Sequence, residues 1–130
     1  MTALIKRSKV IEEIQQVRSD RLDFDQVGEM KYLGWCLKES LRLKPPIICL
    51  MRKVLHDQQY KGFVIPKDDY ICTSPVLNQI DEKYFPDAQK FKPERFSGEG
   101  ATERSSYTPF GGGRHRCIGE PFAEVQVWQG

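Results

Sequence analysis

The sequence predicts a mainly helical fold with a small region of β-strands. Apolar residues recur at helical spacing over residues 2–17 and again up to Leu43, the pattern of helices that cover a core with one face. Between residues 47 and 76, short apolar runs alternate with turns that contain glycine or proline, which is typical of short strands. At 130 residues, the chain has room for one modest domain.

The first helix is expected over residues 2–17. Val10, Ile14 and Val17 recur there at helical spacing, so they share one face. A charged turn follows and completes the first predicted segment, residues 1–24.

The second helix dominates the next predicted segment, residues 25–46. It is expected to begin near Asp25 or Met30 and to end at Leu43, because two prolines follow and cannot continue a helix. One face carries four leucine or methionine side chains and the other a tryptophan with an oppositely charged pair: Met30, Leu33, Leu37 and Leu41 against Trp35, Glu39 and Arg42. A charged pair at this spacing is usually exposed and contributes roughly 0.2 to 0.5 kcal/mol. Here both helix faces are expected to be buried, and a buried pair needs an additional partner.

The remaining chain is expected to form three segments. Residues 47–80 are predicted as short strands with a turn at Gly62, and a short helix is predicted over residues 81–85. Residues 81–109 form a long meander rich in proline, glycine, serine and charge, and such segments are usually functional or poorly ordered. Residues 110–130 hold a glycine-rich loop and the start of a helix.

Composition excludes some classes of partner and site. Twenty basic against eighteen acidic residues give a net charge of +2, too small to imply nucleic acid. No signal peptide and no apolar stretch long enough to span a membrane is recognisable in the sequence. The four cysteines and two histidines do not have zinc-site spacing. A disulfide framework is disfavoured, and we expect reduced thiols in a protein that faces the cytosol.

Cys117 is the strongest candidate for a functional side chain. It follows three consecutive glycines, which allow a flat, bulky ligand to approach the main chain. Arg114, His115 and Arg116 add positive charge, and a helix start follows, so the position favours an ionised thiol that can bind a metal. A lone cysteine is more often a small buried apolar residue, and the chemistry alone leaves both interpretations open.

The spacing of this loop carries a family resemblance. Phe110, Gly113, His115, Cys117 and Gly119 fill the pattern Phe-x-x-Gly-x-His-x-Cys-x-Gly, which resembles the haem-binding loop of the cytochrome P450 monooxygenases. The fold implied is a C-terminal fragment of the cytochrome P450 fold.

Two further motifs stand in the order of that family. Glu39-Ser-Leu-Arg42 resembles its Glu-x-x-Arg helix, and residues 91–96 resemble the segment that supplies a second arginine, here Arg95. In the family these residues form a structural triad that locks the region around the cysteine loop. The resemblance therefore gives Glu39, Arg42 and Arg95 a role in rigidity and none in chemistry.

Three stretches are similar to the sterol 14α-demethylases within this family: residues 41–53, 71–79 and 107–126. His115 is a strong part of the match, because most of the wider family has arginine at that position. Gly112 is a conservative departure, since these enzymes commonly carry alanine there.

The resemblance implies haem b (iron protoporphyrin IX) as the cofactor, with Cys117 as the axial ligand of its iron. Arg52 and His115 would bind the haem propionates. Other cofactor contacts would come from the loop itself: Phe110, Gly111 and Gly119. An apolar run would line the substrate cavity, although its alternative interpretation is an ordinary buried strand: Ile47, Ile48, Cys49, Leu50 and Met51.

The function implied is a haem-thiolate monooxygenase that removes the 14α-methyl group of a sterol. The cysteine thiolate would donate electron density to iron and favour cleavage of O2. Electrons would come from NADPH through NADPH-cytochrome P450 reductase. Arg114 and Arg116 could meet acidic residues of this reductase, with solvated surface arginines as the alternative. Eukaryotic family members lie in the endoplasmic reticulum membrane and face the cytosol.

The resemblance covers most of this chain but only a C-terminal portion of the family's domain. We therefore expect an incomplete and inactive enzyme, which is poorly soluble or loosely packed by itself. Two alternatives remain open: a P450 of another substrate class, and a non-catalytic fragment that binds haem.

Overall fold

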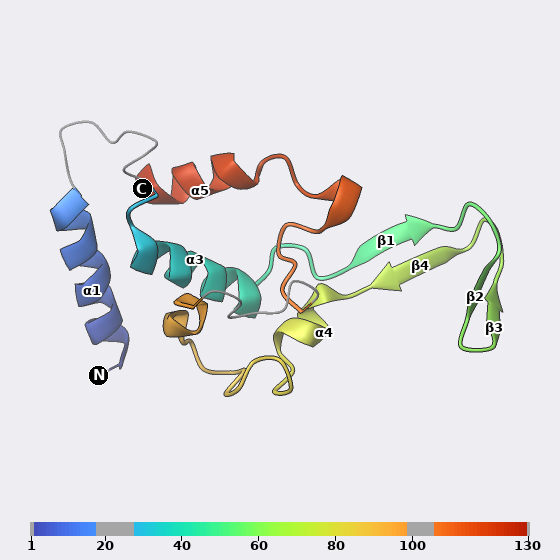
Figure 1. Cartoon of the computed structure of the whole chain (residues 1–130), viewed down its shortest axis with the longest axis horizontal. Coiled ribbons are helices and arrows are strands. Elements are labelled where there is room, and N and C mark those ends of the chain that lie inside the picture. Colours follow the sequence, from blue (N-terminus) through green and yellow to red (C-terminus); the bar gives the residue numbers. More distant parts are fainter. Residues whose placement is uncertain (1, 18–27, 99–105, 130) are drawn as a thin grey trace.

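The computed structural model describes residues 2–17, 28–98 and 106–129. Helix α1 (Thr2–Val17) lies beside α3 (Lys31–Leu43) at one end of the molecule, and the strands extend away from them to the opposite end. Helix α5 (Glu120–Gln129) runs alongside α3 (Figure 1). The helical and strand regions therefore form the two ends of an elongated unit. The predicted mainly helical fold with a small strand region is confirmed.

Helix α1 supports the start of α3. The carboxylate of Glu13 accepts hydrogen bonds from the backbone N–H groups of Tyr32 at 2.7 Å and of Leu33 at 2.8 Å. The first turn of a helix leaves such N–H groups without intrahelical partners. The contact between α1 and α3 is therefore a cap supplied by a different helix, and Met30, just before α3, is buried with 1% exposure. Asp25, the alternative start expected for this helix, lies outside the described residues.

The longer pair of strands is antiparallel. Strand β1 (Leu50–Lys53) pairs with β4 (Tyr70–Thr73) in a register that places Met51 opposite Cys72. Beyond the end of the ladder, the N–H of Val54 donates to Asp69 O, and the N–H of Asp68 donates to Val54 O, both at 2.8 Å. These bonds close the excursion of residues 55–67 at its base.

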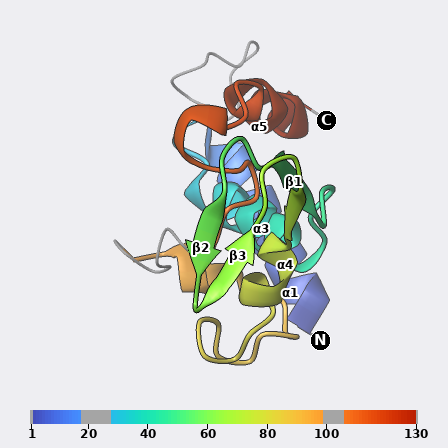
Figure 2. The ribbon, with the colours of Figure 1, turned by 90° about the vertical axis from the view of Figure 1, so that its right-hand side faces the viewer.

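The second pair of strands is a hairpin at the far end of the molecule, seen in front in Figure 2. Strand β2 (Gln58–Tyr60) pairs antiparallel with β3 (Phe63–Ile65). The two-residue turn between them is Lys61-Gly62, with φ of 49° and 84°. Positive φ at both central positions is the geometry that matches the twist of a hairpin, and glycine adopts it without strain.

The sequence prediction is wrong at the end of the strand region. The sequence predicts short strands over the segment 47–80 and a short helix over residues 81–85, but the structure has helix α4 at Pro75–Gln79 and hydrogen-bonded turns at 81–85. Proline fixes its φ at a value suited to the first position of a helix, which explains why α4 begins there.

The meander packs against α3 through the 3₁₀ helix η1 (Pro93–Phe96). Pro93 is buried, and the ring of Phe96 lies 5.1 Å from that of Tyr107, centroid to centroid. Residues 99–105 of the expected meander lie outside the described residues. A second 3₁₀ helix, η2 (Gly113–His115), lies in the glycine-rich loop before α5.

The expectation of reduced thiols is wrong for one pair of cysteines. Cys49 and Cys72 form a disulfide with their Cα atoms 6.5 Å apart. Cys49 immediately precedes β1 and Cys72 lies in β4, so the antiparallel ladder brings the two sulfur atoms together. Cys36 and Cys117 are the free cysteines of the chain.

The buried apolar core is small within the described ranges. It comprises four side chains around α3 and the meander, Met30, Tyr32, Phe85 and Ala88, and separately Val54 at the far end of the β1–β4 ladder. Large apolar side chains are exposed elsewhere, including Phe63 at 74% and Ile118 at 98%. None of the helices within the described part of the chain has both the length and the apolar character to cross a membrane.

Candidate functional site

Glu39 and Arg42 form a buried ion pair on one face of α3. The guanidinium binds the carboxylate with two hydrogen bonds, from Nε to Oε2 at 2.7 Å and from Nη2 to Oε1 at 2.9 Å. Both residues have 0% exposure. Such bidentate pairs are strong and geometrically specific, and burial separates this one from the exposed pairs that this spacing usually gives.

Arg42 also connects α3 to two other segments. Its Nη1 donates to the carbonyl oxygen of Gln79, at the end of α4, at 2.7 Å. Its Nη2 donates to the carbonyl oxygen of Lys90 at 3.4 Å. The guanidinium carbon lies 5.1 Å from the ring centroid of Phe85, within range of a cation–π contact. One side chain therefore joins α3, α4 and the meander.

Arg95 joins the same carboxylate from η1. Its Nε donates to Glu39 Oε1 at 3.1 Å, and the backbone N–H of Lys92 donates to the same oxygen at 2.8 Å. The structure thus brings Glu39, Arg42 and Arg95 into direct contact. We call these three residues the ionic cluster.

Acid is expected to destabilise the fold through Glu39. Burial raises the pKa of Glu39, but hydrogen bonds from Arg42 and the N–H of Lys92, with the two guanidinium charges, outweigh it and hold the pKa below its ordinary 4.5. A lowered pKa in the folded state means that Glu39 stabilises the fold above pH 4.5, and this contribution is lost as the pH falls through the folded-state pKa. Urea unfolding measured from pH 7 to pH 3 should show this loss.

The matched control for this pH dependence is the variant Glu39→Gln, which cannot titrate at this position. It should be less stable than the wild type at pH 7, and the difference between the two proteins should shrink below pH 4.5. A constant difference over the whole pH range would contradict a titrating Glu39.

The loop that carries Cys117 turns back on itself. The N–H of Cys117 donates to Phe110 O at 2.8 Å, and the N–H of Arg116 donates to Gly113 O at 3.3 Å. Gly111 and Gly113 have φ of 75° and 59°, a left-handed backbone that favours glycine. The Cys117 side chain is exposed, so its sulfur is available to an external ligand.

Gly119 lies close to this sulfur. A Cβ atom built at residue 119 would lie 3.6 Å from Cys117 Sγ, an ordinary contact distance. A larger side chain would cover part of the thiol, so glycine keeps that side of the sulfur open.

A pocket adjoins the loop on the side that faces α3. It has a volume of about 660 Å³, and its lining includes Lys38, Phe110, Gly111 and Glu120. The hydroxyl of Tyr107 donates to the carbonyl oxygen of Lys38 at 2.9 Å, which ties the start of the loop to the Glu-x-x-Arg helix.

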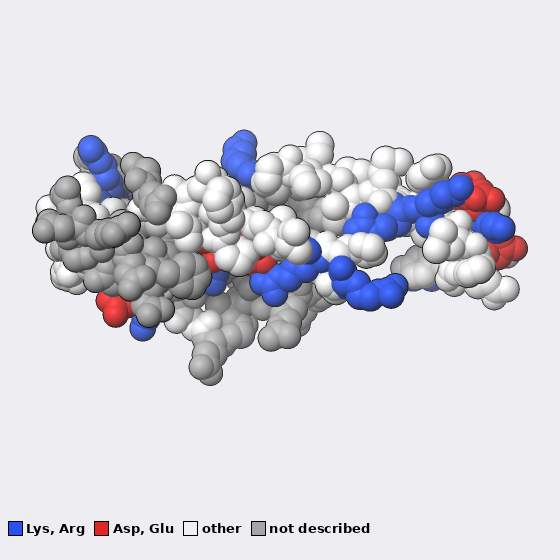
Figure 3. All heavy atoms as spheres, turned by 90° about the horizontal axis from the view of Figure 1, so that it is seen from above, with Lys and Arg blue, Asp and Glu red and all other residues white. Residues whose placement is uncertain are grey.

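Positive side chains flank an opening between β1 and the loop segment that contains η2. Figure 3 shows Lys and Arg atoms on both sides of this opening, and Figure 2 shows the two segments apart in the perpendicular view. Arg52 is exposed on β1 and donates from Nη1 to Met51 O at 2.8 Å. His115 is exposed at the end of η2. The arrangement suits a ligand with negative groups at its edge.

Arg114 and Arg116 are both exposed on this loop. Arg116 Nε donates to Glu120 Oε2 at 2.7 Å, and this bond raises the pKa of the arginine. Arg116 therefore has a partner within the chain.

The apolar run before and within β1 is accessible to solvent. Ile47, Ile48 and Met51 are exposed by 56%, 67% and 60%. Cys49 is exposed as well, and Leu50 is half-buried. An ordinary buried strand, the alternative interpretation of this run, does not describe it.

Several backbone groups that bind the ionic cluster could not be identified from motifs. The carbonyl oxygens of Gln79, Pro86 and Lys90 and the N–H of Lys92 all bind its side chains. Every residue carries a carbonyl group, so no residue type marks these positions. Phe85 differs from these backbone groups because its side chain makes the contact. Once the fold is known, its aromatic ring is recognisable as a cation–π partner of Arg42 and Arg95.

The residues present fit a haem with a thiolate ligand. The exposed Cys117 offers a sulfur atom, glycines permit close approach of a flat ring, and lysine and arginine side chains flank the opening beside the loop. Haem binding through one thiolate requires no cluster of further metal ligands.

Comparison with known proteins agrees with this chemistry. The family model described as Cytochrome P450 matches residues 6–129. Lanosterol 14-alpha demethylase of Homo sapiens is 41% identical over 82% of this chain, which corresponds to 21% of the human protein. The enzyme of the same name from Eremothecium gossypii is 36% identical over 95% of this chain and 28% of its own length.

A solved structure shows the same fold. Retinoic acid bound cyanobacterial CYP120A1 superimposes with a TM-score of 0.84 at 32% sequence identity, over 98% of this chain and 31% of that one. The chain thus spans between a fifth and a third of the relatives that it matches.

Proposed function

Because this chain belongs to the cytochrome P450 family, we propose that it forms the haem-thiolate part of a monooxygenase, with haem b as the cofactor. The observation that carries the proposal is the exposed Cys117 on a loop whose backbone is closed by the bond from its N–H to Phe110 O. Cys117 would bind the haem iron through its thiolate. Bound haem would supply the oxygen-activating chemistry of a monooxygenase.

The residues around the thiol would hold the ring. Arg52 on β1 and His115 on η2 would bind the propionates from the two sides of the opening, as charge-assisted hydrogen bonds. Phe110, Gly111 and Gly119 would lie against the ring or close to the sulfur. The two glycines leave room for it, because neither carries a side chain.

The ionic cluster would keep this loop in place. Glu39 and Arg42 fix α3 against the meander, and Tyr107 fixes the start of the loop against the carbonyl oxygen of Lys38 in α3. The position of Cys117 therefore depends on α3, and the role of the cluster is rigidity.

For the complete enzyme we propose the sterol 14-demethylase reaction, since relatives of that name are 36% to 41% identical to this chain. The exposed run at residues 47–51 would line the cavity for the apolar sterol. The reaction would use O2 and electrons from NADPH-cytochrome P450 reductase, with Arg114 as a candidate contact of the reductase. The complete enzyme would lie in the endoplasmic reticulum membrane and face the cytosol.

One observation favours another substrate class as the second candidate. The cyanobacterial relative with a TM-score of 0.84 binds retinoic acid, which is not a sterol. An apolar cavity lining such as residues 47–51 suits either molecule. A fragment that binds haem without catalysis is the third candidate, and the experiment below separates it from a chain that binds no haem.

The experiment is reconstitution of the purified chain with haemin, followed by reduction and an absorption spectrum under carbon monoxide. The expected result is a strongly red-shifted Soret band, the signature of thiolate ligation. Cys117→Ala should abolish this band because the alanine has no ligand atom.

The matched control is Cys36→Ala, which removes the other free cysteine. Burial and the charge of Glu94 raise the pKa of Cys36 to about 11, so its thiol stays protonated and half-buried in α3. This variant should keep the band. Loss of the band in both variants, or its persistence in Cys117→Ala, would count against Cys117 as the ligand.

A further inference from the structure

One peptide group of the meander, which joins Pro86 to Asp87, is held at both ends by charged side chains. Its carbonyl oxygen accepts hydrogen bonds from Arg95 Nη1 at 3.1 Å and from Nη2 at 3.2 Å. Its N–H donates to Glu82 Oε2 at 2.7 Å. The described peptide bonds are all trans, so this C=O and this N–H point in opposite directions. Glu82 and Arg95 therefore lie on opposite sides of one peptide group.

Glu82 also fixes the turn that orients this peptide. Its Oε1 accepts a hydrogen bond from the N–H of Ala88 at 2.9 Å, and Ala88 has 0% exposure. The two N–H groups that bind Glu82 belong to Asp87 and Ala88, and Asp87 has a φ of 55°. This left-handed conformation is uncommon for residues other than glycine. Two N–H groups bound to one carboxylate offset its cost, since bonds to an ionised acceptor are strong.

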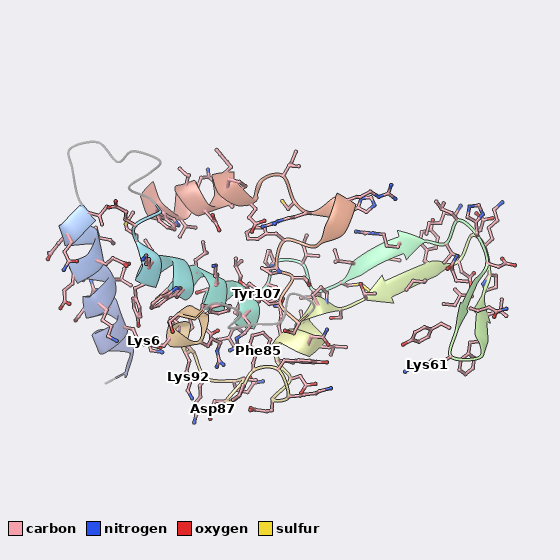
Figure 4. All side chains as sticks on the ribbon, viewed as in Figure 1. Lys6, Lys61, Phe85, Asp87, Lys92 and Tyr107 are labelled. Carbon is pink, nitrogen blue, oxygen red and sulfur yellow. A yellow bond between two sulfur atoms is a disulfide. The ribbon has the colours of Figure 1, made fainter. Side chains whose placement is uncertain are left out.

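Asp87 links this turn to Lys92, whose backbone binds the ionic cluster. Its carboxylate binds Lys90 Nζ at 2.8 Å and Lys92 Nζ, and these contacts lower its pKa to about 2. Figure 4 shows Asp87 and Lys92 next to each other below α3. The backbone N–H of Lys92 donates to Glu39. The segment from Pro86 to Lys92 thus contacts the ionic cluster at both of its ends, through the Pro86 carbonyl oxygen and the Lys92 N–H.

We propose that Glu82 is a positioning residue for Arg95, and that Glu82 acts on Arg95 through the Pro86–Asp87 peptide group. Glu82 holds this group in the orientation in which its carbonyl oxygen binds the Arg95 guanidinium, and Arg95 is thereby held against Glu39. Charged partners at both ends polarise a peptide group in the same direction, so each hydrogen bond strengthens the other. The inference rests on the proposed function, because Arg95 would affect the haem site only through the ionic cluster, which would keep the Cys117 loop in place.

The test measures solvent exchange of the Arg95 Nε–H proton by NMR in the full chain, in the wild type and in Glu82→Gln. The glutamine keeps the shape but loses the negative charge and one of the two acceptor oxygens. We expect exchange to accelerate by roughly two- to fivefold, the change in an opening equilibrium that an exposed charged contact supports. The matched control is Asp57→Asn, because Asp57 is an exposed carboxylate that likewise accepts a backbone N–H bond, from Lys67 at 2.7 Å, outside the ionic cluster. Equal exchange in all three proteins would overturn the proposal.

A second variant keeps the charge. Glu82→Asp is one methylene shorter and cannot reach both N–H groups, so it should give an intermediate acceleration; if Glu82→Gln does not fold, an unchanged rate in Glu82→Asp overturns the proposal. A double-mutant cycle of Glu82→Gln and Arg95→Lys tests whether Glu82 has only a local role. We expect the loss of unfolding free energy in the double variant to differ from the sum of the two single losses. Simple additivity would refute action through Arg95.

The carbon monoxide spectrum of the same samples separates this inference from the function. Faster Arg95 exchange in Glu82→Gln, in a chain that gives no thiolate-type band, would overturn the proposed haem site and leave the role of Glu82 in place. A thiolate-type band with unchanged Arg95 exchange in Glu82→Gln would overturn the role of Glu82 and leave the proposed haem site in place.

Discussion

Replacement of Arg42 by methionine should cost about 3 to 5 kcal/mol of unfolding free energy, the usual effect of removing one partner of a buried ion pair. Methionine fills the volume of the side chain, but it leaves the Glu39 carboxylate with fewer donors at 0% exposure and frees the carbonyl oxygens of Gln79 and Lys90. A loss of this size is comparable with the whole stability of many small domains. Urea unfolding followed by circular dichroism measures it.

The matched control for Arg42→Met is Arg52→Met. Arg52 is exposed on β1 and its side chain binds the carbonyl oxygen of its neighbour Met51, so its loss should change stability by no more than about 0.5 kcal/mol. Similar midpoints for the two variants would show that the ionic cluster does not hold the fold together.

Phe85→Ala should be nearly as damaging, with a loss of about 3 to 5 kcal/mol. Phe85 has 1% exposure, and its ring centroid lies 5.1 Å from the guanidinium carbon of Arg42 and 5.9 Å from that of Arg95. Truncation therefore opens a cavity beside two charged groups and also removes their aromatic contact. The measurement is again the urea midpoint at constant slope.

Two further variants separate the parts of this effect. Phe85→Leu keeps most of the apolar volume but not the aromatic face, and should cost much less than the alanine. Phe63→Ala removes the same side chain at a position that is 74% exposed, in the hairpin, and should be almost neutral. If Phe63→Ala and Phe85→Ala were equally destabilising, the packing around the ionic cluster would not be the cause.

Periodicity predicts much of the helical part, and the family resemblance of two motifs implies the members of the ionic cluster. Helix α1 covers the residues for which apolar spacing predicts a helix, and α3 ends at Leu43, before the two prolines. Glu39, Arg42 and Arg95 carry charges that are recognisable at fixed positions, and the structure brings them together. Local patterns suffice for the helices, whereas the contact of Arg95 with Glu39, 56 residues apart, is implied by the resemblance.

The errors concern features that depend on long-range register or on backbone atoms. The disulfide joins cysteines 23 residues apart, and only the antiparallel pairing of β1 with β4 brings them together. The sequence predicts a strand where α4 lies, because a short apolar run fits either structure. The carbonyl oxygen of Pro86, which binds Arg95, is a group that every residue possesses.

The bonds that join Val54 to Asp68 and Asp69 make residues 55–67 a detour that leaves the ladder and returns to the same point. Val54 is itself buried, at 4% exposure, so the base of the detour is fixed independently of what lies beyond it. The turn at Lys61-Gly62 is consequently a site where additional sequence can be accommodated, because the ends of any insertion there already meet. Lengthening the hairpin would leave both the ladder register and the distant ionic cluster untouched, which makes this end of the molecule a place for a reporter peptide or a family-specific extension.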